Sequence, residues 1–484
     1  MIQTILIYLS QALAIAYLPI AIFATIHVVL NKEDERAAIG WVGLIWLSPL
    51  IGAGLYWFLG INRISRKAHR LKSDLPEIDL TPRQCAVSDQ QFTKTLGEHA
   101  PHLRPLIHLV GELTDRPLLV GNAIEPLDSG DAAYPAMIEA IDRAERSVAM
   151  SSYIFDNDQA GGMFRDALSN AVKRGVEVRV LIDDIGSRYT WPPIVRSLRK
   201  AGVPTARFLP TMIPWTSSYT NLRNHRKLLI VDGSVGFTGG MNIRFGNLLE
   251  QAPEKSAIHD LHFKLRGPVV AHLLEAFAQD WVFTTRKTLK GAAWKPTTES
   301  YGKMLARGIP DGPDEDYDKL RLTLMGAITA ARSHVVIITP YFIPDDALLA
   351  AMSVAAKRGV RVQILLPEVN NLRLVQWASA ATFPRALARG CEIWLTPPPF
   401  DHSKLMVVDD CWALIGSANW DARSLRLNFE FNVEAYDQEF VSQLNRIVQG
   451  KLESARRLTA DELAQRPLPA RIRNGIARLA SPYL

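Results

Sequence analysis

Cysteine is scarce in this chain of 484 residues, and no two of its three cysteines (Cys85, Cys391 and Cys411) form a CxxC pair. Three scattered cysteines exclude a disulfide framework and favour reduced thiols in a reducing compartment. Charged residues make up only 21% of the chain, hydrophobic residues make up 48%, and the formal net charge is +6. This composition excludes a disordered or fibrous chain, and the mild basic balance neither requires nor excludes nucleic acid as a partner.

Charge is absent altogether from two apolar runs near the N-terminus, at 5–30 and 37–60. Each run exceeds the roughly 20 residues that a helix needs to cross a bilayer. Because only residues 31–36 separate the runs, we predict that residues 1–60 form a transmembrane helical hairpin. A cleaved signal peptide is the alternative for the first run. It fits poorly, since the run has no basic start and is longer than a signal core.

Cations without acids follow the hairpin. Residues 61–72 hold five lysines and arginines and no aspartate or glutamate. By the positive-inside rule, this segment and everything after it lie on the cytoplasmic side. We therefore treat 61–110 as a basic juxtamembrane linker whose cations suit anionic headgroups.

The remaining chain contains an internal duplication. Residues 171–182 (AVKRGVEVRVLI) and 355–366 (AAKRGVRVQILL) are identical at seven of twelve positions. Alternating helices and short apolar strands predict an α/β sandwich with a largely parallel sheet in each copy. We assign the copies to 111–305 and 306–484, joined by the Gly-, Pro- and acid-rich stretch 308–318. The expected helix, strand and helix lie at 134–146, 147–155 and 161–174 in the first copy, and at 317–332, 334–341 and 346–358 in the second.

Each copy carries the same motif, H-x-K-x4-D-x6-G-[GS]-x-N, without a gap. Two matches at equivalent places of an internal duplication are a specific signal. The candidate catalytic residues are His225, Lys227, Asp232, His402, Lys404 and Asp409, and the candidate phosphate-binding residues are Asn242, Asn419, Ser417 and Gly240.

The spacing predicts which groups share a face. On an extended chain, a His and the Lys two residues later point the same way, whereas the Asp lies at an odd offset. We therefore expect Asp232 and Asp409 to be mostly structural. If the copies meet about a pseudo-twofold axis, two imidazoles, two ammonium groups and two amides surround one pocket. Such a set suits a phosphodiester anion, with one imidazole as nucleophile and the other as proton donor.

Each imidazole needs a partner on its second ring nitrogen. The acids that follow the two motifs at roughly matching places are Asp260 and Glu430. We expect Asp260 to orient His225 and Glu430 to orient His402, the alternative for either acid being a surface ion pair.

With these residues in view, the chain resembles the phospholipase D superfamily, and bacterial cardiolipin synthases in particular. The segments SSYIFDNDQAG, TPYFIPD and GSANWDARSLRLNFEFN carry the resemblance beyond the motif itself. It implies two tandem phospholipase D-like domains at the bacterial cytoplasmic membrane. It also implies phosphatidyl transfer between two phosphatidylglycerols, without metal or cofactor, with His225 as nucleophile and His402 as general acid and base. Membrane lipids are then the partners, and nucleic acid is not expected.

Two other activities remain open, a hydrolytic phospholipase D with water as acceptor and, less favoured, a nuclease of the same superfamily.

His259 and His262 flank Asp260 without further ligands at metal-site spacing, so we predict no metal. Among four tryptophans, we expect only Trp420 to line a lipid groove, and Trp191, Trp215 and Trp377 to fill cores. The segment 471–479 places Ile472, Ile476 and Leu479 on one helical face. A helix at the membrane interface and a helix packed on its own domain fit this pattern equally.

Overall fold

The computed structural model describes residues 2–32, 34–60, 75–76, 78–210, 222–313 and 318–483. The chain divides into two compact units, Met1–Lys67 and Ala68–Leu484. The cations at 63–72, on which the predicted orientation depends, and Trp215 lie outside the described residues.

The first unit consists of helices, as the charge-free runs predict: α1 (Ile2–Asn31), α2 (Glu35–Leu47), α3 (Pro49–Leu55) and the π-helical turn η1 (Tyr56–Gly60). Asp34 caps α2 by accepting a hydrogen bond of 2.7 Å from the Ala37 N–H. The second run is not one helix, because Ser48 leaves the helical conformation. Proline disfavours helical geometry in the residue before it, so Pro49 ends α2 and starts α3. Among the residues searched, no helix is both long and apolar enough to cross a membrane.

The second unit repeats one order of elements, as the duplication predicts. The first copy comprises β1 (Leu119–Asp128), α7 (Ser129–Asp142), β2 (Ser147–Ser152), α8 (Gln159–Lys173), β3 (Glu177–Asp183), α9 (Ile194–Lys200), β4 (Thr205–Phe208), β6 (Leu228–Val231), β7 (Val235–Gly239), β9 (Leu261–Arg266) and α10 (Val270–Thr285). The second comprises β10 (Met304–Asp311), α11 (Lys319–Ala330), β11 (His334–Ile338), α12 (Asp346–Lys357), β12 (Arg361–Pro367), α13 (Arg373–Ala388), β13 (Glu392–Thr396), β15 (Leu405–Val408), β16 (Trp412–Gly416), β17 (Asn428–Tyr436) and α15 (Gln438–Ser454).

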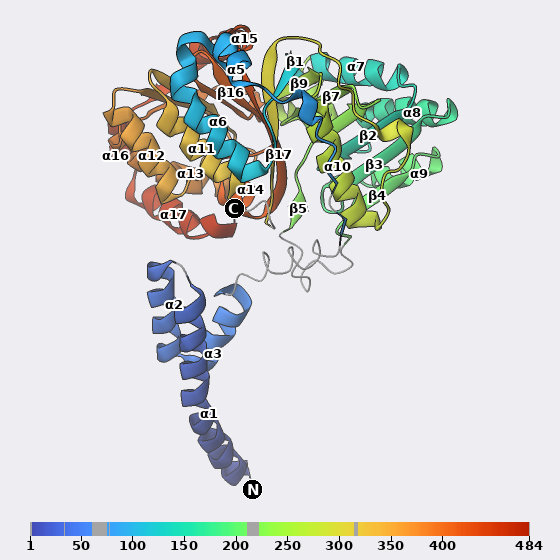
Figure 1. Ribbon diagram of the computed structural model, residues 1–484. Coiled ribbons are helices and arrows are strands. Elements are labelled where there is room, and N and C mark those ends of the chain that lie inside the picture. Colours follow the sequence, from blue (N-terminus) through green and yellow to red (C-terminus); the bar gives the residue numbers. More distant parts are fainter. Residues whose placement is uncertain are drawn as a thin grey trace. The chain divides into compact units, whose positions relative to one another are not determined.

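One continuous sheet runs through both copies. Its strand order is β13-β12-β11-β15-β16-β17-β10 in the second copy and β1-β9-β7-β6-β2-β3-β4 in the first, with β18 (Arg456–Leu458) added at the edge. The two halves meet where β1 pairs with β10 in antiparallel fashion. Read outward from this pair, both halves have the same order, which is the arrangement a twofold relation requires. Figure 1 shows β1, β9 and β17 between the helices of the two copies.

Two details of the predicted sheet are wrong. The sheet is mixed rather than largely parallel, because along the strand order given above only β2–β3–β4 and β11–β12–β13 pair in parallel. The other neighbours, such as β6 and β7, are antiparallel and joined by tight turns, which parallel strands cannot use. The stretch 308–318 is also not simply a linker, since its first residues complete the buried strand β10.

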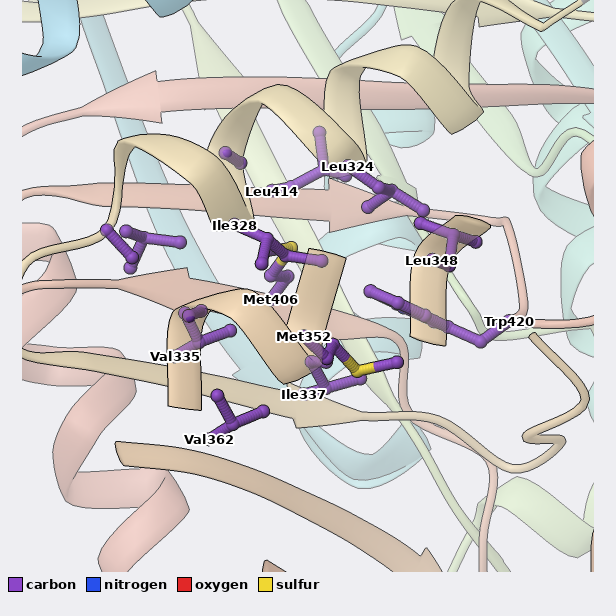
Figure 2. Close-up of a cluster of buried hydrophobic side chains, with 14 of the residues drawn as sticks. Leu324, Ile328, Val335, Ile337, Leu348, Met352, Val362, Met406, Leu414 and Trp420 are labelled. Atoms are coloured by element: carbon purple, nitrogen blue, oxygen red, sulfur yellow. The ribbon is translucent and has the colours of Figure 1, made fainter. Parts of the chain in front are cut away.

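Three large apolar clusters form most of the core of the second unit, and the central one draws residues from both copies, including Phe263 of β9 and Phe431 of β17. A second cluster lies between the helices α11 and α12 and the strands of the second copy (Figure 2). Trp420 belongs to this cluster and is only 4% exposed, whereas Trp191 is 82% exposed. The expectation for these two tryptophans is therefore wrong in both cases, because Trp420 packs beside Phe342 beneath α12.

Candidate active site

Short strand pairs between the copies hold the two motif histidines. Strand β5 (Arg223–Asn224) of the first copy lies parallel to β17, with Asn224 opposite Phe429. Strand β14 (Phe400–Asp401) of the second copy lies parallel to β8 (Ile258–His259) of the first, with Asp401 opposite His259. Each histidine follows directly, and its backbone N–H donates across the copies, from His225 to the Phe429 carbonyl and from His402 to the His259 carbonyl.

This register decides which acid serves which imidazole. Glu430 follows Phe429, and its carboxylate lies 2.9 Å from Nδ1 of His225. Asp260 follows His259, and its carboxylate lies 2.7 Å from Nδ1 of His402. Both acids are fully buried. The two acids are thus imidazole partners, but the predicted assignment is wrong, because each histidine takes its acid from the other copy.

The motif lysines are buried beside their histidines. Lys227 donates a hydrogen bond of 2.6 Å to the backbone carbonyl of His225, and Lys404 donates one to the carbonyl of His402. Lys227 also lies over the ring of Tyr153, 5.6 Å from its centroid. Each ammonium group therefore lies close to its imidazole, as the two-residue spacing predicts.

The motif aspartates hold backbone turns away from the imidazoles, as expected. Asp232 accepts hydrogen bonds from the backbone N–H groups of residues 145, 146 and 147. Asp409 accepts equivalent bonds from residues 332, 333 and 334 and a further one from the Ser333 hydroxyl. Both adopt positive φ angles, of 52° and 45°, at the turn after a motif strand.

The glycine and serine of the motif differ for a steric reason. A Cβ at Gly240 would overlap the Asp260 carboxylate, so any larger residue would have to displace that acid. The Ser417 hydroxyl instead donates to Glu430 at 2.5 Å. Among the described contacts, Ser417 thus supports the acid behind His225, and this corrects its expected place on the phosphate.

A single cavity of about 420 Å³ is lined by both imidazoles and by the motif amides Asn242 and Asn419. The Asn242 Oδ1 accepts a hydrogen bond of 3.1 Å from the Ile154 N–H, and its amide nitrogen has no partner among the described residues. The two copies therefore do form one site, the arrangement on which the sequence-based chemistry depends.

Sequence reasoning missed two tyrosines of this cavity. Tyr153 lies edge-on to the His225 ring, with centroids 5.1 Å apart, and Tyr341 lies edge-on to the His402 ring at 6.2 Å. They occupy equivalent places in the repeat, directly after β2 and shortly after β11. That equivalence was the available signal, but an aromatic residue after a strand usually indicates packing.

Burial and like charge set the protonation of the site. Desolvation lowers the pKa of His225 to about 4 and that of Lys227 to about 7. The pKa of Lys404 is lowered to about 8 for the same reason, and burial lowers the pKa of His402 well below its usual value. Both imidazoles are therefore neutral at pH 7 in the empty site, and both ammonium groups gain stability when an anion binds.

The two acids differ in their protonation. Burial raises the pKa of Asp260 to about 6. Burial also acts on Glu430, but His225, Lys227 and the Ser417 hydroxyl outweigh it and hold the pKa of that carboxyl below its usual value. Glu430 is therefore the more firmly ionised acid, and it is the one bonded to His225.

His259, next to Asp260, has other partners. His259 lies 2.6 Å from Asp128 and 3.5 Å from Asp401, so it belongs to an ion-pair network at the β8–β14 pair. Elsewhere, donor atoms of His99, His102 and Cys411 lie within 4.8 Å of one another. Three donors fall short of the four that structural zinc sites use.

Comparisons with known proteins show which family the chain belongs to. A family model described as cardiolipin synthase, PLD-like domain, matches residues 137–281 and 324–451, and a phospholipase D-nuclease N-terminal model matches 20–60. The chain belongs to the cardiolipin synthase family of phospholipase D-like proteins.

Members of this family resemble the chain over almost its full length. A cardiolipin synthase from Geobacillus kaustophilus is 31% identical over 469 residues, which covers 96% of this chain and 92% of the relative. Cardiolipin synthase A from Pseudomonas putida is 32% identical over 473 residues, covering 96% of each. The crystal structure of a phosphatidylserine synthase from Haemophilus influenzae has the same fold, with a TM-score of 0.62 at 17% identity. It covers 78% of this chain and 100% of that one.

Proposed function

We propose that the protein joins two phosphatidylglycerol molecules into cardiolipin and glycerol by phosphatidyl transfer through His225. The observation that carries the proposal is the single cavity lined by His225 and His402, each held at Nδ1 by a buried acid of the other copy. Cardiolipin synthase relatives at about 31% identity over the full chain supply the substrate class.

In the first step, Nε2 of His225 attacks the phosphorus of one phosphatidylglycerol. A P–N bond forms, the P–O bond to the headgroup glycerol breaks, and the glycerol oxygen takes a proton from His402. His225 suits the attack because its Nδ1–H donates a hydrogen bond to the ionised Glu430. The proton of the neutral imidazole therefore stays on Nδ1, and Nε2 is unprotonated. The ammonium groups of Lys227 and Lys404 stabilise the charge on the phosphoryl oxygens.

In the second step, a headgroup hydroxyl of the other phosphatidylglycerol gives its proton to His402 and attacks the phosphorus. The P–N bond breaks, and cardiolipin leaves. One phosphodiester replaces another, so the exchange needs neither a nucleotide nor a metal. The first step requires a protonated His402. Burial and the neighbouring lysines lower the pKa of His402, and the negative charge of a bound phosphodiester raises it again.

The test is product analysis with the purified full chain and phosphatidylglycerol labelled in its headgroup and acyl chains. We expect cardiolipin and free glycerol in equal amounts and little phosphatidic acid. His225→Ala should abolish turnover, whereas His108→Ala, which changes an exposed histidine of α6 (Ala100–Thr114), should leave it unchanged. Phosphatidic acid as the main product would replace the proposal with a hydrolytic phospholipase D. Loss of activity with a chelator would overturn the metal-free chemistry.

We further propose that the N-terminal hairpin spans the bacterial cytoplasmic membrane and that the catalytic unit lies on its cytoplasmic side. The charge-free runs support this, and so do the apolar side chains that the hairpin exposes, such as Phe23 at 68%, Ile39 at 73% and Leu47 at 86%. Such outward apolar side chains suit lipid rather than water. Protease added outside sealed spheroplasts should leave the catalytic unit intact, and its digestion there would refute the orientation.

A further inference from the structure

The C-terminal helix α17 (Leu468–Leu479) presents an apolar stripe to solvent. Leu468, Ile472, Ile476 and Leu479 are 64%, 52%, 63% and 77% exposed. Their spacing places them on one face of the helix. The opposite face of α17 packs against the domain, where Asn474 and Ala477 are buried. Ala477 belongs to an apolar cluster with Val375 and Ala378 of α13. Packing on its own domain thus uses only one face of α17. This confirms one of the two sequence alternatives for the helix, and the membrane-interface alternative stays a prediction.

An apolar groove continues the stripe onto α13. Its volume is about 530 Å³, and its walls are formed by Leu374 and Trp377 of α13 with Leu468, Ile472 and Ile476 of α17. Arg473 is the charged residue in this lining, and its guanidinium lies over the Trp377 ring, 4.6 Å from the centroid. Figure 1 shows α17 beside α13 at the edge of the catalytic unit.

The same helix α13 connects this groove with the active site. Leu372, just before α13, and Val375 line the catalytic cavity, while Leu374 and Trp377 line the groove. Leu372 and Leu374 are 49% and 44% exposed, so apolar surface runs from the groove to the cavity rim. On the other copy, Tyr189 lines the cavity and is itself exposed.

Charge on the helix favours one kind of occupant. The sequence of α17 contains Arg471, Arg473 and Arg478 and no acid, and all three arginines are exposed. An apolar face flanked by arginines is the pattern of helices that lie in the interface of an anionic membrane. A second copy of this chain would bring the same cations against one another, which disfavours a dimer through this face.

We propose that α17 and the first turns of α13 form a membrane-docking surface through which the catalytic cavity meets the lipid. The apolar stripe inserts among the acyl chains, and the arginines contact anionic headgroups. Phosphatidylglycerol then slides along Leu374 and Leu372 to the imidazoles without crossing water. Docking itself does not depend on the proposed function, whereas the entry route rests on it.

Depth in the bilayer tests docking without any activity. Ile476→Cys and, as a matched control, Val354→Cys would be labelled with bimane in the full chain carrying Cys85→Ser. Val354 is an apolar residue of α12, 59% exposed, and Cys391 and Cys411 are buried. In vesicles of phosphatidylglycerol and brominated phosphatidylcholine, we expect strong quenching at 476 and little at 354. Equal quenching at both positions, or none at 476, would overturn the proposal.

Turnover then tests the entry route. The double variant Ile472→Asp/Ile476→Asp should lose at least tenfold activity on phosphatidylglycerol in vesicles. It should keep full activity on a short-chain phosphatidylglycerol dissolved as monomers, and Val354→Asp should keep both. Unchanged turnover in vesicles, or equal loss on both substrates, would refute the route. If the wild type makes no cardiolipin, the proposed function fails, and the quenching result stands by itself.

Discussion

The crossed pairing of acids and imidazoles leads to a sharp kinetic prediction. Glu430→Gln removes the charge that holds His225, the proposed nucleophile, and Asp260→Asn removes the charge that holds His402, the proposed proton donor. A hydrogen bond to a charged group is worth about 1.5–3 kcal/mol, which corresponds to a rate effect of about 10- to 150-fold. The bonds of 2.9 Å and 2.7 Å place both variants in this range.

A substrate with a good leaving group separates the two roles. A p-nitrophenyl phosphodiester of phosphatidic acid releases its phenolate without a proton, so formation of the phosphoenzyme no longer needs His402. We expect Glu430→Gln to slow the p-nitrophenolate burst about 10- to 150-fold, and Asp260→Asn to leave the burst nearly unchanged. With phosphatidylglycerol itself, both variants should be slow.

His225→Ala and His402→Ala serve as controls, because the variant without a burst identifies the nucleophile independently. If Asp260→Asn slowed the burst while His225→Ala abolished it, the acid behind the nucleophile would be Asp260. The crossed pairing would then be wrong. Equal effects of both acid variants on the burst would refute the division of labour.

Three further results are expected. Because burial lowers the pKa of Lys227 to about 7, its positive charge is lost as the pH rises past that value. A pH profile of kcat/KM should therefore fall from pH 7 to 9, and a flat profile would contradict the role of the lysine. Gly240→Ala forces Asp260 aside and should reduce turnover about tenfold or more, whereas Gly450→Ala, with open space around it, should not. Asp409→Asn weakens hydrogen bonds from three backbone N–H groups, so the free energy of unfolding should fall by about 1.5–3 kcal/mol. Thermal melting would show this as a lower Tm. An unchanged Tm would argue against its structural role.

Local patterns in the sequence predicted most of the elements. The helices and strands of each copy follow from apolar spacing, and the largest errors concern pairing rather than element type. Parallel and antiparallel neighbours have similar apolar strands, so composition alone did not reveal that β6, β7 and β9 run antiparallel. The break at Ser48 had a readable cause in Pro49, but its effect was underestimated.

The sequence by itself determined which functional groups are available for the proposed chemistry, because two HxK motifs in an internal duplication specify two imidazoles and two ammonium groups whatever the fold. Only the tertiary structure decided which acid forms a hydrogen bond with each imidazole. Glu430 reaches His225 because β17 and β5 pair in one register, and Asp260 reaches His402 through the matching pair of β8 and β14. Those contacts form between residues that are 205 and 142 positions apart. The spacing of residues along the chain does not predict these contacts, because each histidine approaches its acid only when the two copies pack against each other.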